Sequence, residues 1–199
     1  MRLMHRPKML TAVASLAVGL STLALGVQSA AASEAPGNDS VTTTMVATGY
    51  DADVAAAHGY RIEVQPDGTP VAIPVSDEAK AAEAAAITPF TTVGGNCGTS
   101  SVVILDAGGG KAAVSTGFNL IRGAVSYGWQ VNVTGFAGGY TKNFGGVIAN
   151  HSTWQGSFTW TVPTSGTYIA KVAESSWALM NNGVICTSAG PVDSEYVYR

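Results

Sequence analysis

Residues able to act as a base or a nucleophile are few in this chain, and none falls into a catalytic motif. Only His58 and His151 follow residue 32, and nucleophilic catalysis needs a base beside a serine or cysteine. Asp106, His151 and a serine have the residue types of a triad, yet no Gly-x-Ser-x-Gly turn presents a serine. We therefore interpret His151 as a polar loop residue and predict that the protein is not an enzyme.

The sequence also contains carboxylates, glycines and residue types that bind metals, but their spacing does not form a functional site. Asp193 and Glu195 would point to one face of a strand about 7 Å apart, which indicates a solvated outer face rather than a glycoside-hydrolysing pair. Residues 106–112 have the glycines of a phosphate loop, but Ala112 stands where Ser or Thr would meet magnesium. Two separated histidines and two cysteines form no ligand cluster. We expect no catalytic residue, no metal and no cofactor.

The residues best suited to bind a ligand are aromatic. Trp154, Trp160 and Tyr140 stand among neutral Asn, Gln, Thr and Gly, and flat rings in such surroundings suit sugar stacking with neutral hydrogen bonds. We predict these three as ligand-binding residues. The alternative is that alternating aromatic faces are simply core, which applies above all to Trp129, Trp160 and Phe158.

Short β segments separated by glycine must position these rings. Residues 125–133 and 154–162 alternate apolar with polar side chains, the period of a half-buried strand. Residues 181–183 (Asn-Asn-Gly) lie between two apolar runs and predict a hairpin. Seven or eight such segments in residues 89–199, without a convincing helix, predict an all-β fold, an antiparallel β-sandwich.

Both cysteines lie in this second part of the chain. Cys97 and Cys186 form an even pair, which predicts a disulfide in an oxidising compartment. The alternative, a reactive or metal-binding thiol, has no nearby histidine or acid in the sequence. We therefore predict the disulfide.

The N-terminal residues 1–32 have the three parts of a secretory signal. A basic start precedes the apolar and small-residue run 9–27, and three alanines at 30–32 supply a cleavage site. An uncleaved anchor is the alternative, because about 19 apolar residues could just span a bilayer. The small residues favour cleavage, so we expect a secreted, extracellular protein without membrane attachment after cleavage.

Charge divides the exported chain into two parts. Residues 33–88 hold nine acids and two bases, whereas residues 89–199 hold four acids and five bases. The excess of acids argues against nucleic acid or an anionic membrane as a partner, because both need positive charge. We predict an acidic, partly disordered leader at 33–88 and a disulfide-linked β domain at 89–199.

The leader itself has weak structural patterns. Residues 33–49 are polar without a hydrophobic period, which indicates flexibility. A short helical turn is expected at 51–58, a small hairpin from 60–64 and 71–75, and a helix from Asp77 that Ser76 would cap. This part is expected to act as a linker rather than as core.

The segment from Trp160 to Tyr168 (WTVPTSGTY) resembles the strand-turn-strand of extracellular immunoglobulin-like sandwiches. In those domains a tyrosine corner begins a strand, and the resemblance gives this role to Tyr168. True immunoglobulin domains carry a cysteine two residues later, where this chain has Ala170. The motif is shared by unrelated sandwiches and implies no function.

The layout as a whole resembles small exported proteins of actinobacteria that have no assigned activity. The shared elements are the alanine-rich signal, the acidic leader with His58-Gly59-Tyr60, and a Gly/Thr/Trp-rich β domain with residues 96–98 (Asn-Cys-Gly) and 184–187 (Val-Ile-Cys-Thr). The resemblance spans most of the exported chain and brings no catalytic residue.

Two functions are consistent with these observations. The first is a secreted, non-enzymatic module that binds a cell-envelope or extracellular polysaccharide. The second is a secreted inhibitor or protein-interaction domain whose acidic leader is a removable pro-segment, which would make an extracellular protein the partner. The sequence does not determine the oligomeric state.

Overall fold

The computed structural model describes residues 40–85 and 96–199, so the predicted signal and cleavage site lie outside the described residues. The described residues form ten strands and two short helices, which confirms the all-β prediction. The strands are β1 (Val41–Tyr50), β2 (Tyr60–Val64), β3 (Pro70–Pro74), β4 (Asn96–Asp106), β5 (Lys111–Gly135), β6 (Gly138–Thr161), β7 (Gly166–Val172), β8 (Trp177–Met180), β9 (Val184–Ser188) and β10 (Val192–Val197). The helices are α1 (Ala52–Ala57) and α2 (Asp77–Ala85).

Eight of the strands form one antiparallel sheet that closes on itself. The pairing order is β10-β7-β5-β4-β1-β9-β8, β6 pairs β5 beside this path, and β8 pairs again with β5. The strands β5, β4, β1, β9 and β8 therefore form a closed ring. The chain does not divide into the two separate sheets expected of an immunoglobulin-like sandwich, because β5 belongs to both sides of the ring.

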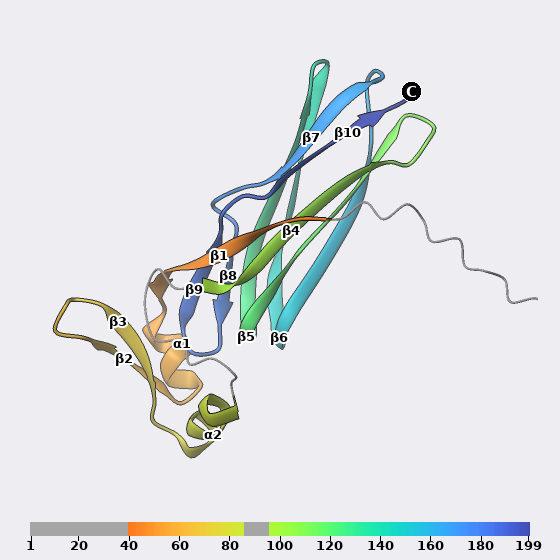
Figure 1. The fold of residues 1–199 in the computed structure, drawn as a ribbon. Coiled ribbons are helices and arrows are strands. Elements are labelled where there is room, and N and C mark those ends of the chain that lie inside the picture. Colours follow the sequence, from red (N-terminus) through yellow and green to blue (C-terminus); the bar gives the residue numbers. More distant parts are fainter. Residues whose placement is uncertain (1–39, 86–95) are drawn as a thin grey trace, which may run out of the picture. The chain divides into compact units, whose positions relative to one another are not determined.

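The unusual length of β5 and β6 makes this closure possible. The two strands have 25 and 24 residues and pair along their whole length, with irregularities near residues 119–126. Both turn back sharply at the end where their labels stand in Figure 1. The first half of β5 thus pairs with β4, and its second half pairs with β8 and β7.

Two residues allow the backbone to turn at this bend. Asn150 has a left-handed φ of 58°, which asparagine tolerates better than most residues. A Cβ on Gly123 would lie 2.1 Å from Asn150 Oδ1, so only glycine lets the two strands approach here. The alternation in the sequence predicts these halves only as separate short strands and does not reveal the bend.

The leader contributes a central strand to the sheet. Residues 41–49 were expected to be flexible, but β1 pairs with β4 on one edge and with β9 on the other. Residues 37–199 form one compact unit. The leader strand β1 and the strands after residue 96 therefore belong to one sheet.

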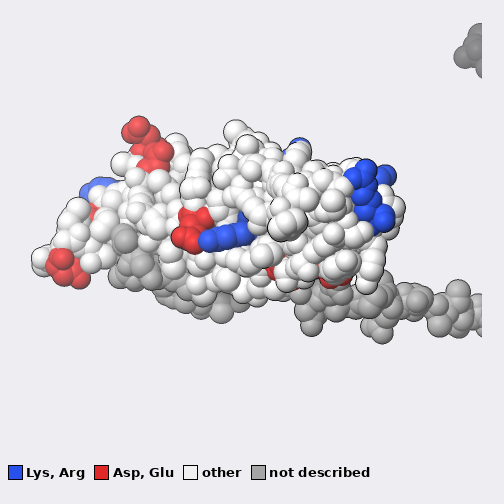
Figure 2. All heavy atoms as spheres, turned by 90° about the horizontal axis from the view of Figure 1, so that it is seen from above, with Lys and Arg blue, Asp and Glu red and all other residues white. Residues whose placement is uncertain are grey.

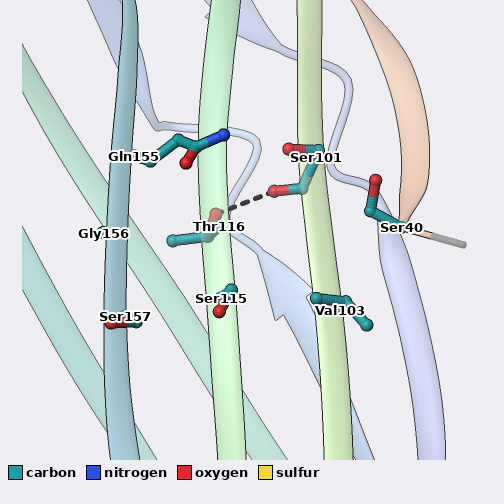
Figure 3. Close-up of a pocket in the computed structure, with 8 residues that line it drawn as sticks. All are labelled: Ser40, Ser101, Val103, Ser115, Thr116, Gln155, Gly156 and Ser157. Carbon is teal, nitrogen blue, oxygen red and sulfur yellow. Dashed lines mark hydrogen bonds between the residues drawn. The ribbon is translucent and has the colours of Figure 1, made fainter. Parts of the chain in front are cut away.

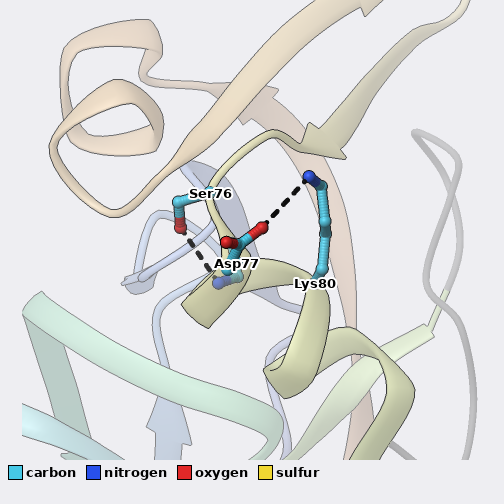
Figure 4. Close-up of polar contacts among 4 residues, drawn as sticks. Ser76, Asp77 and Lys80 are labelled. Atoms are coloured by element: carbon cyan, nitrogen blue, oxygen red, sulfur yellow. Dashed lines mark hydrogen bonds and ion pairs between the residues drawn. The ribbon is translucent and has the colours of Figure 1, made fainter.

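The rest of the leader follows the sequence predictions. Asp51 caps α1 by accepting hydrogen bonds from two backbone amides, and β2 pairs with β3 as a two-stranded hairpin. Ser76 caps α2, because its Oγ accepts a hydrogen bond from the Ala79 amide at 3.1 Å (Figure 4). In the same turn, Nζ of Lys80 lies 3.4 Å from Oδ1 of Asp77. At the end of α2, Glu83 Oε2 lies 2.6 Å from Nη2 of the buried Arg122, which joins the helix to β5.

The core fills the space between the two halves of the long hairpin. Trp129 is 2% exposed and packs against Phe118, with ring centroids 5.4 Å apart. Its indole Nε1–H donates to Thr116 Oγ1 at 2.9 Å, which satisfies a buried donor. The alternative interpretation of Trp129 as core is therefore confirmed.

The predicted disulfide is present. Cys97 at the start of β4 is bonded to Cys186 in β9, and both residues are fully buried. These two strands flank β1, so the bond lies beside the strand that the leader contributes. No helix within residues 40–85 and 96–199 is long and apolar enough to cross a membrane.

Tyr168 forms the predicted corner. Its side chain is 1% exposed, and its hydroxyl donates to the carbonyl oxygen of Thr164 at 2.8 Å. Replacing it, Tyr168→Phe, should lower the free energy of unfolding by about 1 kcal/mol, because one hydrogen bond is lost and the ring remains. Urea unfolding followed by tryptophan fluorescence measures this loss. Tyr198→Phe, at a position that is largely exposed, should leave the unfolding midpoint unchanged.

Candidate functional site

A neutral hollow of about 340 Å³ lies over the outward face of β4, β5 and β6. All eight lining residues are uncharged, and five of them carry a hydroxyl. They are Ser40, Ser101, Val103, Ser115, Thr116, Gln155, Gly156 and Ser157 (Figure 3). Sugar hydroxyls both donate and accept hydrogen bonds, as do these side chains. The chemistry of the lining therefore fits an uncharged, hydroxyl-rich ligand.

Strand register explains why the surface is hollowed here. Ser101, Gly117 and Gln155 pair across β4, β5 and β6 in one row, and Val103, Ser115 and Ser157 form the next row. Gly117 contributes no side chain to the middle of its row. A Cβ there would lie 2.3 Å from the Trp154 carbonyl oxygen, so the backbone requires glycine at this point.

Most polar groups around the hollow are free to bind a ligand. Thr116 is engaged, because its hydroxyl donates to the Ser101 carbonyl oxygen at 2.8 Å (Figure 3). Within the described part of the chain, no hydrogen bond occupies the hydroxyls of Ser115 and Ser157 or the amide of Gln155. Three polar side chains on two neighbouring strands therefore present unused donors and acceptors.

The surroundings carry little charge. None of the eight lining residues titrates. On the face that Figure 2 displays, the Lys, Arg, Asp and Glu side chains stand in a few separate groups with uncharged surface between them. Charged ligands would find no counter-charge in the hollow, so hydrogen bonding has to supply the affinity.

The three predicted ligand-binding residues lie on the opposite side of β6 from this hollow. They belong to a row of five rings that we call the aromatic row: Tyr140, Phe144, Trp154, Phe158 and Trp160. Tyr140 is 38% exposed and the other four are half-buried against the core. The structure therefore brings Tyr140, Trp154 and Trp160 into one row.

The rings of the aromatic row contact each other from the two halves of β6. Tyr140 stacks on Trp160 with centroids 6.1 Å apart and an interplanar angle of 15°. Phe144 meets Trp154 edge to face at 5.2 Å. Because Tyr140 and Trp160 lie nearly parallel against each other, a sugar ring has less aromatic face to stack on than the sequence indicates.

A smaller hollow of about 250 Å³ contains Trp177, whose indole lies over Gly128. Gln130 Nε2 donates to Asn143 Oδ1 at 2.9 Å on this surface. The two amides are already bonded to each other, so this surface offers fewer free groups than the hydroxyl-lined hollow.

The rejected catalytic residues are also not brought together. Asp106 pairs opposite Ala112 near the start of β5, whereas His151 pairs opposite Ala124 at the bend, so the two residues lie at opposite ends of the first half of β5. Asp193 has a structural role, because its carboxylate accepts a hydrogen bond from the Ile104 amide at 2.9 Å. Within residues 40–85 and 96–199, no three metal-ligand residues gather at one point.

The hollow was missed in the sequence, although half of its pattern is visible there. Gln155 and Ser157 are the polar partners of the alternation that contains Trp154 and Phe158. The other lining residues come from β4 and β5, and only the register shows that they meet. No family model matches this chain, and searches of curated proteins and of solved structures find no match either.

Proposed function

We propose that the protein is a secreted, non-enzymatic module that binds an uncharged cell-envelope or extracellular polysaccharide. The carrying observation is the neutral hollow, with free hydrogen-bonding groups on Ser115, Gln155 and Ser157. The disulfide supports an oxidising, extracellular location. The Tyr168 corner is a feature of immunoglobulin-like extracellular domains, which supports an extracellular module.

Retention on insoluble polymers tests the proposal. The purified protein should be retained on peptidoglycan, chitin or cellulose. The double variant Gln155→Ala/Ser157→Ala should bind about tenfold more weakly, because two neutral hydrogen bonds are together worth about 1.4 kcal/mol. Thr159→Ala is the matched control, since Thr159 lies on the same face of β6 outside the hollow.

Salt and pH separate this binding from adsorption through charge. Because the lining carries no titratable group, retention should not change with ionic strength or between mildly acidic and mildly basic buffer. Trp154→Ala separates the hollow from the aromatic row, since loss of retention in this variant alone would move the site to the rings. Absence of retention on every polymer would contradict the proposal.

The second function, an inhibitor with a removable acidic pro-segment, is disfavoured by the position of β1. Cleavage near residue 89 would leave β1 within the sheet, with residues 41–46 paired with β4 and residues 45–50 paired with β9. Such a segment would have to open the ring to leave. A cleaved chain that releases its N-terminal part without denaturant would restore this alternative.

A further inference from the structure

The outer edge of β6 has no neighbouring strand. Among the strands that the structure describes, β6 pairs with β5 alone, although it is 24 residues long. An exposed edge of this length presents unpaired backbone N–H and C=O groups that can pair with another chain. Proteins usually protect such edges with charge, proline or short length.

The second half of β6 has none of these protections. Residues 152–161 contain no charged residue and no proline. Lys142 lies in the first half, beyond the bend at Asn150. Thr, Trp, Phe and Ser dominate the segment, and the first three favour strands. Nothing in its side chains repels a second strand.

The same segment is complementary to itself. In an antiparallel pair with Gly156 opposite Gly156, Trp154 lies opposite the second copy's Phe158. Thr153 then lies opposite the second copy's Thr159. At these pairs a ring meets a ring on one face and a hydroxyl meets a hydroxyl on the other, while Trp160 lies opposite the second copy's Ser152 and Gln155 opposite its Ser157. The uncharged pairs on both faces give the self-complementarity that a two-fold interface requires.

The aromatic row gives this pairing an apolar driving force. Its five rings stand along the open edge of the folded hairpin, and none is fully buried. A two-fold axis at Gly156 places the second half of β6, with Trp154 and Phe158 of the aromatic row, against the same half of the second copy. The rings would then leave water, which favours association.

We propose that the protein forms a two-fold symmetric dimer through antiparallel pairing of residues 152–161 of two copies. A foreign peptide would satisfy the backbone equally, but only a second copy matches the alternation along the whole segment and covers the aromatic row. If the proposed function holds as well, the two neutral hollows lie next to each other on the outward face, because Gln155 and Ser157 are adjacent to the axis.

Sedimentation equilibrium across the micromolar range tests the dimer without any polysaccharide. The protein should have twice its monomer mass. The variant Thr153→Lys/Thr159→Lys places lysines opposite each other at both pairs and should return the mass to that of the monomer, because like charges directly opposite repel. Both side chains are exposed, so the monomer accommodates them.

The control variant carries the same added charge away from the free edge. Thr99→Lys/Thr134→Lys changes exposed residues on β4 and β5, which are paired on both edges, and should remain dimeric. Circular dichroism and cooperative unfolding show that both variants fold. A wild-type protein that is monomeric throughout, or a Thr153→Lys/Thr159→Lys variant that stays dimeric, would overturn the proposal and leave polysaccharide binding untouched.

Discussion

Replacing both cysteines, Cys97→Ala/Cys186→Ala, should lower the free energy of unfolding by about 4–5 kcal/mol on the chain-entropy model. The bond closes a loop with a sequence separation of 89 residues, which strongly restricts the unfolded chain. Since whole domains are stable by only about 5–15 kcal/mol, this loss would leave the protein near the limit of folding.

Urea unfolding of the wild-type protein with and without reductant, beside the double variant, measures this effect. Reduction should shift the wild-type midpoint to that of the variant and should not affect the variant. A loss of less than about 1 kcal/mol would contradict the expectation and would indicate a compact unfolded chain whose loop needs little closing.

Truncation of the buried tryptophan, Trp129→Ala, should lower the free energy of unfolding by about 3–5 kcal/mol. The residue is 2% exposed, contacts the rings of Phe118 and Trp154, and bonds to Thr116. Removing the indole therefore creates a cavity between the halves of the folded hairpin. Differential scanning calorimetry and urea unfolding measure the loss.

A related variant distinguishes packing from hydrogen bonding at this position. Thr116→Val keeps the shape of the side chain but leaves the Trp129 indole Nε1–H without its acceptor. This should lower the free energy of unfolding by about 1–3 kcal/mol. Trp177→Ala serves as the matched control, because Trp177 is only half-buried and its loss should be smaller. Equal losses of unfolding free energy in Trp129→Ala and Trp177→Ala would mean that the two halves of the folded β5–β6 hairpin close around the missing indole.

The strands with clear alternation could be predicted, and β1 could not. Residues 125–133 and 154–162 alternate apolar and polar side chains and form parts of β5 and β6. In β1 the buried residues are small or isolated, with Met45 and Ala47 among threonines. Threonine favours strands, but three consecutive threonines also look like a polar linker. Their partners in β4 and β9 decide between these interpretations.

The candidate site was visible only in part for a related reason. The alternation shows that Gln155 and Ser157 share a face, but not which neighbours they have. The hollow depends on Gly117 lying between Ser101 and Gln155, which is a matter of register between distant strands. The mutual stacking of Tyr140 and Trp160 likewise depends on the bend at Asn150.

The position of β1 has a consequence for the order in which the chain acquires its structure. Met45 is among the first described residues to be synthesised, yet its partner Ser188 is among the last. Contacts of such long sequence separation form slowly, because the intervening chain must first be ordered. The ring therefore cannot close until the C-terminal strands have emerged. A chain whose ring stays open until its last strands are available can pass through a narrow channel before it folds, which suits the export that we propose.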